Sequence, residues 1–115
     1  MSTPVVHLEV TGQDGQKLQA FFSDVFGWQL DANNEQNYGV GMVNDTVGVG
    51  VGPAQEGQGA AVFYMAVDDV DGTLAKAESA GGSRIMGPME VPNGPTIGLF
   101  ADPEGHMVGV FQPPS

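Results

Sequence analysis

One order of strand and helix periods occurs twice along this chain, and this internal repeat limits the possible folds more than any single motif does. Each half opens with an extended apolar run, continues with a helical run, and ends in three further extended runs. The opening runs are residues 5–10 and 60–67, and the helical runs are 11–27 and 68–82. The order predicts two βαβββ modules.

The two predicted modules together make a single α+β domain of 115 residues, which is enough for one hydrophobic core. Module one covers about residues 1–52 and module two about 60–115, and the polar, glycine-rich segment 53–59 is the expected linker. We expect the two sheets to combine into one curved, mixed and mostly antiparallel sheet. This sheet would form a cup, with the helices outside and a concave inner side for a ligand.

Start and stop signals bound the predicted elements. Gly27 ends the first helix, and Asp69 or Asp71 caps the start of the second. Asn and Asp turn residues separate the shorter extended runs of the first half. The shorter extended runs are residues 28–32, 36–43 and 46–52 in module one, and 83–91, 95–101 and 106–111 in module two.

The charge balance excludes several classes of partner. The chain has 14 acidic residues and only 3 basic ones, for a net charge of −11. Phosphate binding needs clustered Lys and Arg, so we expect neither nucleic acid nor an anionic membrane surface as a partner. A negative field favours cationic small molecules; the alternative is that the charge only keeps the protein in solution.

Cysteine and long apolar runs are both absent. Without cysteine there is no disulfide framework, no thiolate metal site and no cysteine nucleophile. No apolar run approaches the roughly 20 residues of a membrane span, and the beginning of the chain lacks the pattern of a signal peptide. A cytoplasmic location is the expectation.

The first predicted strand, "VVHLEV", places two polar residues on one face. Strict alternation puts Val6, Leu8 and Val10 on the core face, and His7 and Glu9 on the other face. Three interpretations are open for the polar pair: a metal ligand with a neighbouring base, a polar patch that binds a ligand, or a solvated sheet face. Glu9 beside it, in a chain of net −11, predicts that His7 is protonated more readily than a histidine in water.

Five segments together resemble the vicinal oxygen chelate superfamily, the group of glyoxalase I, extradiol dioxygenases and bleomycin resistance proteins. They cover nearly the whole chain and occur in the family's order; they are "HLEV", "FFSDVFGWQL", "FYMAVDDVD", "GPMEVP" and "FADPEGHMVGVFQP". The resemblance implies paired βαβββ modules that form a cup, in a homodimer. It does not fix the function, because this fold hosts unrelated chemistries.

The resemblance also implies where a metal would be held. In metal-dependent members, His or Gln on the first strand of each module and Glu on the last strand of each converge on the metal. His7 matches one of these positions, but Val62 and Gly109 stand at two others, and residues 46–52 offer no carboxylate, imidazole or amide. A divalent metal needs about three nitrogen or oxygen ligands from the protein. We therefore expect no metal and no cofactor.

In place of a metal, we expect the cup to hold a small molecule. Alternation puts Val62, Tyr64 and Ala66 on one face of their strand, and Met107, Gly109 and Phe111 on one face of the last strand. Four glycines, Gly48, Gly50, Gly52 and Gly109, either leave the cavity roomy or only ease sheet curvature and close packing. The residues expected to line the pocket are His7, Glu9, Val62, Tyr64, Met107, Gly109 and Phe111.

Two functions from different classes follow. The first is a metal-free protein that binds and sequesters a small molecule, as the bleomycin resistance branch does. The alternative is a lyase, an isomerase or a dioxygenase-type enzyme that uses His7 and Glu9 as catalytic residues, with or without a divalent metal. A diverged member without activity is the third option. For the homodimer, "FFSDVFGW" and "VFQPP" are the candidate contact segments.

Overall fold

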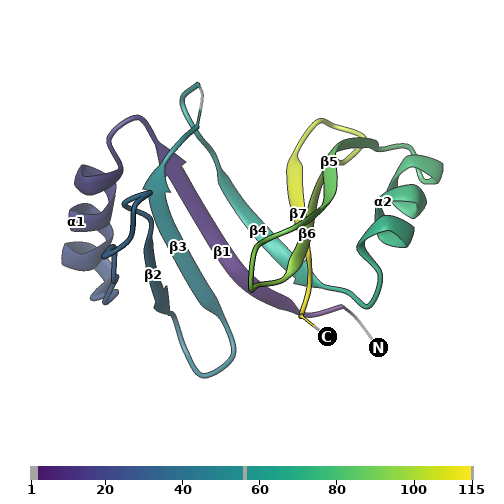
Figure 1. Cartoon of the computed structure of the whole chain (residues 1–115). Coiled ribbons are helices and arrows are strands. Elements are labelled where there is room, and N and C mark those ends of the chain that lie inside the picture. Colours follow the sequence, from purple (N-terminus) through teal and green to yellow (C-terminus); the bar gives the residue numbers. More distant parts are fainter. Residues whose placement is uncertain (1–2, 56, 115) are drawn as a thin grey trace. The chain divides into compact units, whose positions relative to one another are not determined.

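The computed structural model of the chain describes residues 3–55 and 57–114 and divides it into two compact units (Figure 1). The N-half unit is His7–Val62, and the C-half unit combines the residues before His7 with those after Val62. Two strands, β1 (Val5–Gly12) and β4 (Ala61–Ala66), contribute residues to both units. Each unit has one helix and a mixed sheet, so the predicted α+β class is confirmed.

The helix of the N-half unit, α1 (Gly15–Phe26), ends at Gly27 as predicted and begins at Gly15, inside the predicted helical run 11–27. The Asp14 side chain accepts a hydrogen bond from the Lys17 backbone N–H at 3.1 Å, which satisfies one of the unpaired donors of the first turn. Gly27 adopts the left-handed conformation with φ 73°, and its N–H donates to the Ser23 carbonyl. Glycine ends helices in this way because it has no Cβ to clash.

The sheet of the N-half unit has the order β2–β3–β1. Strand β3 (Gly48–Pro53) lies parallel to β1 and antiparallel to β2 (Gly39–Met42). Val49 and Val51 of β3 are fully buried. Val51 pairs with Gly39, where a Cβ would lie 3.3 Å from the side chain of Gln19 in α1. Val49 and Val51 therefore face the helix.

One predicted strand of the N-half unit does not form. Residues 28–32 contribute only an isolated bridge between Asp31 and Val40, in place of the extended run expected there. The Asp31 side chain accepts a hydrogen bond from the Asn33 backbone N–H and turns the chain at once. An Asx turn of this kind competes with strand pairing, so the run ends at one residue.

The C-half unit follows the predicted order without a gap. In the sequence, helix α2 (Val70–Ser79) follows β4 and precedes three further strands. The sheet order is β4–β7–β6–β5, in which β7 lies parallel to β4 and the other neighbours are antiparallel. Asp69 is the N-cap of α2, and its side chain accepts from the Gly72 N–H. The three strands are β5 (Ser83–Glu90), β6 (Thr96–Ala101) and β7 (Met107–Gln112).

The core of the C-half unit lies between α2 and its sheet. Val70 and Leu74 of α2 pack with Val110 of β7, and all three are almost completely buried. Gly98 of β6, the partner of Val110, faces the same helix: a Cβ there would lie 2.9 Å from both Val70 and Leu74. A small residue at this position lets the helix lie close to the sheet.

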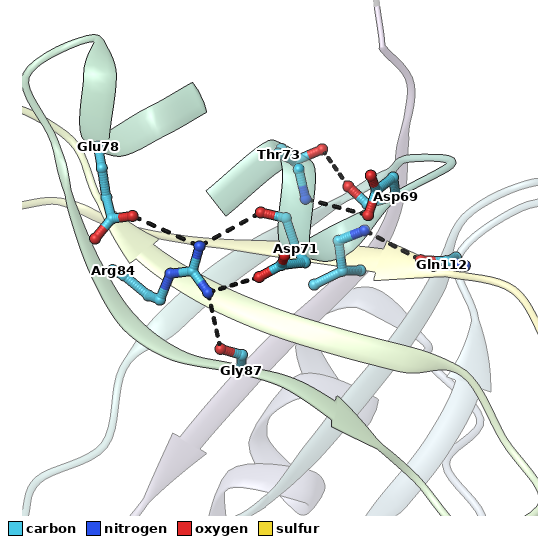
Figure 2. Close-up of polar contacts among 9 residues, drawn as sticks. Asp69, Asp71, Thr73, Glu78, Arg84, Gly87 and Gln112 are labelled. Atoms are coloured by element: carbon cyan, nitrogen blue, oxygen red, sulfur yellow. Dashed lines mark hydrogen bonds and ion pairs between the residues drawn. The ribbon is translucent and has the colours of Figure 1, made fainter. Parts of the chain in front are cut away.

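Arg84 of β5 ties α2 to the sheet from the side (Figure 2). Its guanidinium donates to the Asp71 carboxylate at 2.9 Å and forms an ion pair with Glu78 at 3.5 Å. The hydrogen bond to Asp71 is the main reason that the pKa of Arg84 is raised above its usual value. At the other side of α2, Gln112 accepts a hydrogen bond from the Val70 N–H at 3.1 Å.

No helix of the described residues has the length and apolarity to cross a membrane.

Candidate functional site

His7 and Glu9 lie on the sheet face of the N-half unit that points away from α1. In the parallel ladder, His7 pairs with Gly48 and Glu9 pairs with Gly50. These glycines alternate along β3 with the buried Val49, which faces the helix, and side chains alternate between the faces of a strand. Both polar residues are half-buried.

Tyr38 connects the two polar side chains. Its hydroxyl donates a hydrogen bond to Glu9 Oε2 at 2.9 Å, and the His7 Nε2 atom lies 3.3 Å from the same oxygen. All three residues belong to the N-half unit. The arrangement places an imidazole, a phenol and a carboxylate in one hydrogen-bonded chain, with the first and last group on β1 and the phenol on the loop before β2.

The Tyr38 ring rests directly on glycine backbone. A Cβ on Gly50 would collide with the Tyr38 hydroxyl and ring, and one on Gly52 would lie 2.9 Å from Tyr38 Cδ1. The loop holds the ring there, since the Asn34 side chain accepts from the Tyr38 N–H at 2.9 Å and donates to the Tyr38 carbonyl at 2.8 Å. Above Gly50 and Gly52 the space is filled by an aromatic ring, so these glycines serve close packing and not the roomy cavity that we considered.

Burial lowers the pKa of the His7 imidazole below its usual 6.5, and the negative charge of Glu9 opposes this effect only in part. The expectation that His7 is protonated more readily than a histidine in water is therefore wrong. The free-energy cost of burying the charged imidazolium exceeds the electrostatic stabilisation that the Glu9 carboxylate gives it. His7 acts near neutral pH as an uncharged imidazole that can both donate and accept a hydrogen bond.

The other predicted pocket residues, except Val62, belong to the C-half unit. In the C-half unit, Tyr64 pairs with Gly109 in the β4–β7 ladder. The Tyr64 ring covers Gly109, because a Cβ on Gly109 would lie within 2.7 Å of ring atoms. Gly109 alternates with Val110, which faces α2, so Met107, Gly109 and Phe111 share the face away from that helix. Val62 is buried and belongs to the N-half unit. The joint pocket of all seven residues stays a prediction.

The donor set does not fit the divalent metal that metal-dependent relatives hold. Among residues 3–55 and 57–114, no group of three or more His, Cys, Asp or Glu side chains could hold a metal ion. Val62 and Gly109 have no ligand atoms in their side chains, and His7 Nε2 and Glu9 Oε2 are both engaged by the Tyr38 hydroxyl. An uncharged imidazole and one carboxylate fall short of the three ligands that such an ion needs.

An aromatic cluster forms a second notable surface of the N-half unit. Phe22 stacks on Trp28 with ring centroids 5.1 Å apart, and Phe26 lies 5.5 Å from Trp28. Phe26 is 63% exposed and Phe21 is 56% exposed, so these two rings are not part of the buried core. A hollow of about 670 Å³ lies at this end of α1, lined by Phe26, Gly27, Trp28, Gln29, Met42 and Val43.

Sequence reasoning found His7 and Glu9 but missed Tyr38. Tyr38 lies in a run expected to be a strand, where its alternation gives no sign of a role. A signal was present in the alternating glycines of β3, because three glycines on one strand face leave room for a large side chain from another segment.

Comparison with known proteins identifies relatives of this fold. The profile of the Glyoxalase/Bleomycin resistance protein/Dioxygenase superfamily matches residues 5–110. A protein of Mycobacterium bovis, provisionally named glyoxylase CFP32, is 42% identical over 50 residues, which are 44% of this chain and 19% of that protein. The match thus spans about a fifth of that relative's length.

Two solved structures share the fold. A superfamily member from Vibrio splendidus 12B01 aligns with a TM-score of 0.66 and 19% identity, over 96% of this chain and 99% of that one. The methylmalonyl-CoA epimerase of Streptomyces coelicolor, as its Q60A variant in complex with 2-nitronate-propionyl-CoA, aligns with a TM-score of 0.69 and 18% identity over the full length of both chains. At these identities the likeness concerns the fold alone.

Proposed function

Since the chain belongs to the Glyoxalase/Bleomycin resistance protein/Dioxygenase superfamily, we propose that it binds a small organic molecule without a divalent metal. The site is the sheet face that carries His7, Glu9 and Tyr38. One observation carries the proposal: the two polar residues of β1 are joined by the Tyr38 hydroxyl, and the described residues contain no group of three or more His, Cys, Asp or Glu side chains that could hold a metal ion.

Charge supports a ligand that is neutral or cationic. The chain has a net charge of −11, and Glu9 contributes a carboxylate at the proposed site. A carboxylate accepts hydrogen bonds from ammonium, amidinium or hydroxyl groups and repels anions. Sequestration, that is, binding without turnover, is the role that we propose for the chain.

The second candidate is a metal-free acid–base enzyme, such as a lyase or an isomerase. The observation that favours it is the pairing of an imidazole whose pKa is lowered with a carboxylate, both on one tyrosine hydroxyl. General acid–base catalysis needs two such groups within hydrogen-bond reach of the reacting atoms. Turnover of a bound compound, followed by chromatography, separates this candidate from sequestration.

We further propose that the chain is a homodimer. Phe21, Val25 and Phe26 are more than half exposed on one helix, α1, and an apolar surface of this kind is typical of protein interfaces. The "FFSDVFGW" segment is accordingly the proposed contact region, with "VFQPP" as the second one.

A thermal-shift screen tests the proposed function. Wild-type protein is stripped with EDTA and heated with cationic and hydroxyl-bearing aromatic compounds, bleomycin among them, and separately with zinc, nickel and manganese salts. The variants are the His7→Ala/Glu9→Ala double substitution and, as the matched control, His106→Ala/Glu104→Ala in the exposed turn before β7.

We expect at least one organic compound to stabilise the wild type and the control variant in EDTA, and not the His7→Ala/Glu9→Ala variant. Binding to the native state at a hundredfold excess over Kd stabilises it by about 2.7 kcal/mol, which a melting curve resolves. A screen in which only metal salts stabilise the wild type, or in which the double variant responds like the wild type, would overturn the proposal.

A further inference from the structure

The hollow at the end of α1 lies within the N-half unit, and its lining includes neither His7 nor Glu9. Its volume of about 670 Å³ is in the range of small-molecule sites. Phe26, Trp28 and Met42 supply two aromatic rings and a thioether to the lining. A hollow of this size and chemistry can take up an organic molecule.

An antiparallel bridge forms one wall of this hollow. Asp31 pairs with Val40, which brings the residues before Asp31 alongside those after Val40. A Cβ on Gly41 would collide with the Gln29 carbonyl, so the glycine is what lets the two segments lie close together. The wall is therefore built by the backbone, before any ligand arrives.

The aromatic side of the hollow is held by stacking and by one hydrogen bond. The Trp28 ring stacks on Phe22 with centroids 5.1 Å apart and lies 5.5 Å from Phe26. The Ser23 hydroxyl donates to the Trp28 carbonyl at 2.8 Å, which ties Trp28 back to α1. The faces of aromatic rings carry partial negative charge and attract cations that lie within about 6 Å of the ring centre. Phe26 is more than half exposed, so its ring is accessible to such a cation.

The end of α1 that borders the hollow is negatively charged. The charged residues nearest to the lining in the sequence are Asp24, Asp31 and Asp45. The C-terminal end of a helix is the negative end of its dipole, and the sequence of the last turn, residues 23–26, contains no Lys or Arg to offset it. Lys17, the one basic residue of the N-half sequence, lies in the first turn of α1. This environment favours a cation over an anion.

We propose that this hollow is a second binding site, which takes an organic cation with an alkylated ammonium group. The ammonium group lies against the Phe26 and Trp28 rings, and the rest of the molecule packs on Met42 and Val43. Charge complementarity selects this occupant, because the rings, the helix end and the neighbouring carboxylates all attract a cation. The site does not depend on His7 or Glu9, so its failure and the failure of the proposed function are separate results.

Tryptophan fluorescence of the full chain tests the site directly, since Trp28 is the single tryptophan. Choline is the cationic probe, and dimethylbutanol, in which a carbon atom replaces the charged nitrogen, is the uncharged one. Both are titrated at constant ionic strength. We expect a saturable change of the Trp28 emission with choline, and binding about two- to fivefold tighter than that of the alcohol, the ratio that an exposed cation–π contact supplies. Equal affinities, or no saturable change with choline, would overturn the proposal.

Two pairs of variants locate the binding site. Phe26→Ala removes a ring of the lining, and Phe21→Ala removes an exposed ring of the same helix that lies outside the lining. Met42→Lys adds a positive charge at an exposed position of the hollow, and Met42→Gln is its uncharged counterpart. Choline binding should weaken about two- to fivefold in Phe26→Ala and at least about fivefold in Met42→Lys, with the counterpart of each close to the wild type. Equal losses within a pair of variants that circular dichroism shows to be folded would contradict the site.

A second copy of the chain is the alternative occupant, because Phe26 also belongs to the proposed dimer contact. If the partner copy filled the hollow, choline would have to displace it and would lower the mass found by sedimentation equilibrium. We expect the same choline affinity at low and at high protein concentration, and a mass that choline does not change. An affinity that weakens as the protein concentration rises, together with a mass lowered by choline, would assign the hollow to the second copy and not to a cation.

Discussion

The Tyr38 ring occupies the space that side chains at Gly50 and Gly52 would take. The sequence alternation predicts that His7 and Glu9 share a face, and in the structure both contact one hydroxyl on that face. Tyr38 itself could not be predicted, because it is 29 residues from Glu9 in the chain and reaches it only through the fold of the loop. Local periodicity carries no information on such a contact.

A substitution at Gly50 tests this packing. Gly50→Ala should destabilise the protein by about 1–3 kcal/mol, the usual cost of inserting a methyl group into a filled space, because the new Cβ meets the Tyr38 ring. Urea denaturation measures the loss. In a Tyr38→Ala background the same substitution should cost far less, and an equal cost in both backgrounds would show that Tyr38 is not the obstacle.

The lowered pKa of His7 predicts a pH dependence of stability. Between the lowered folded pKa and the unfolded value of 6.5, the unfolded chain binds more protons than the folded one. The free energy of unfolding therefore rises with pH in this window. The contribution of His7 to stability is lost as the pH falls below 6.5 toward the folded pKa.

In the His7→Gln variant, the slope of the free energy of unfolding against pH should be flatter. The His106→Gln variant should keep more of the wild-type slope. Denaturant titrations over the acid side of neutrality measure both variants. A slope unchanged in His7→Gln would contradict the assignment to His7.

At the scale of elements, local signals predicted both helices and seven of the eight extended runs. Gly27 and Asp69 cap the helices as expected, because capping depends on residues a few positions apart, whereas the cap at Asp14 was not predicted. The run 28–32 was wrong as a strand, since the Asp31 side chain forms a turn instead. The exposure of Phe21 and Phe26 was also not evident, because helical spacing alone does not say which face is covered.

The C-half unit depends on one fully buried side chain of α2. Leu74→Ala should destabilise the protein by about 2–5 kcal/mol, through lost burial and the cavity left between Val70 and Val110. Lys76→Ala, on the exposed side of the same helix, should change the stability by less than about 0.5 kcal/mol. A similar effect of both substitutions in chemical denaturation would contradict the assigned core.

At the scale of the whole molecule, the exposed apolar side of α1 predicts self-association. Sedimentation equilibrium should give the mass of a dimer, and Phe26→Asp should shift it toward the monomer, because a charge at the contact is left unpaired. Val5→Asp, an exposed apolar residue outside the aromatic cluster, is the control. A monomeric wild type, or a dimer unaffected by Phe26→Asp, would contradict a dimer contact at α1.

We propose that the chain binds a small organic molecule through His7, Glu9 and Tyr38 without a metal. Isothermal titration calorimetry of the compound found in the screen tests it most directly, in EDTA and again with added zinc. We expect the same Kd in both buffers and binding at least about tenfold weaker, or about 1.4 kcal/mol, for the His7→Ala/Glu9→Ala variant. Binding that disappears in EDTA and returns with zinc would contradict it.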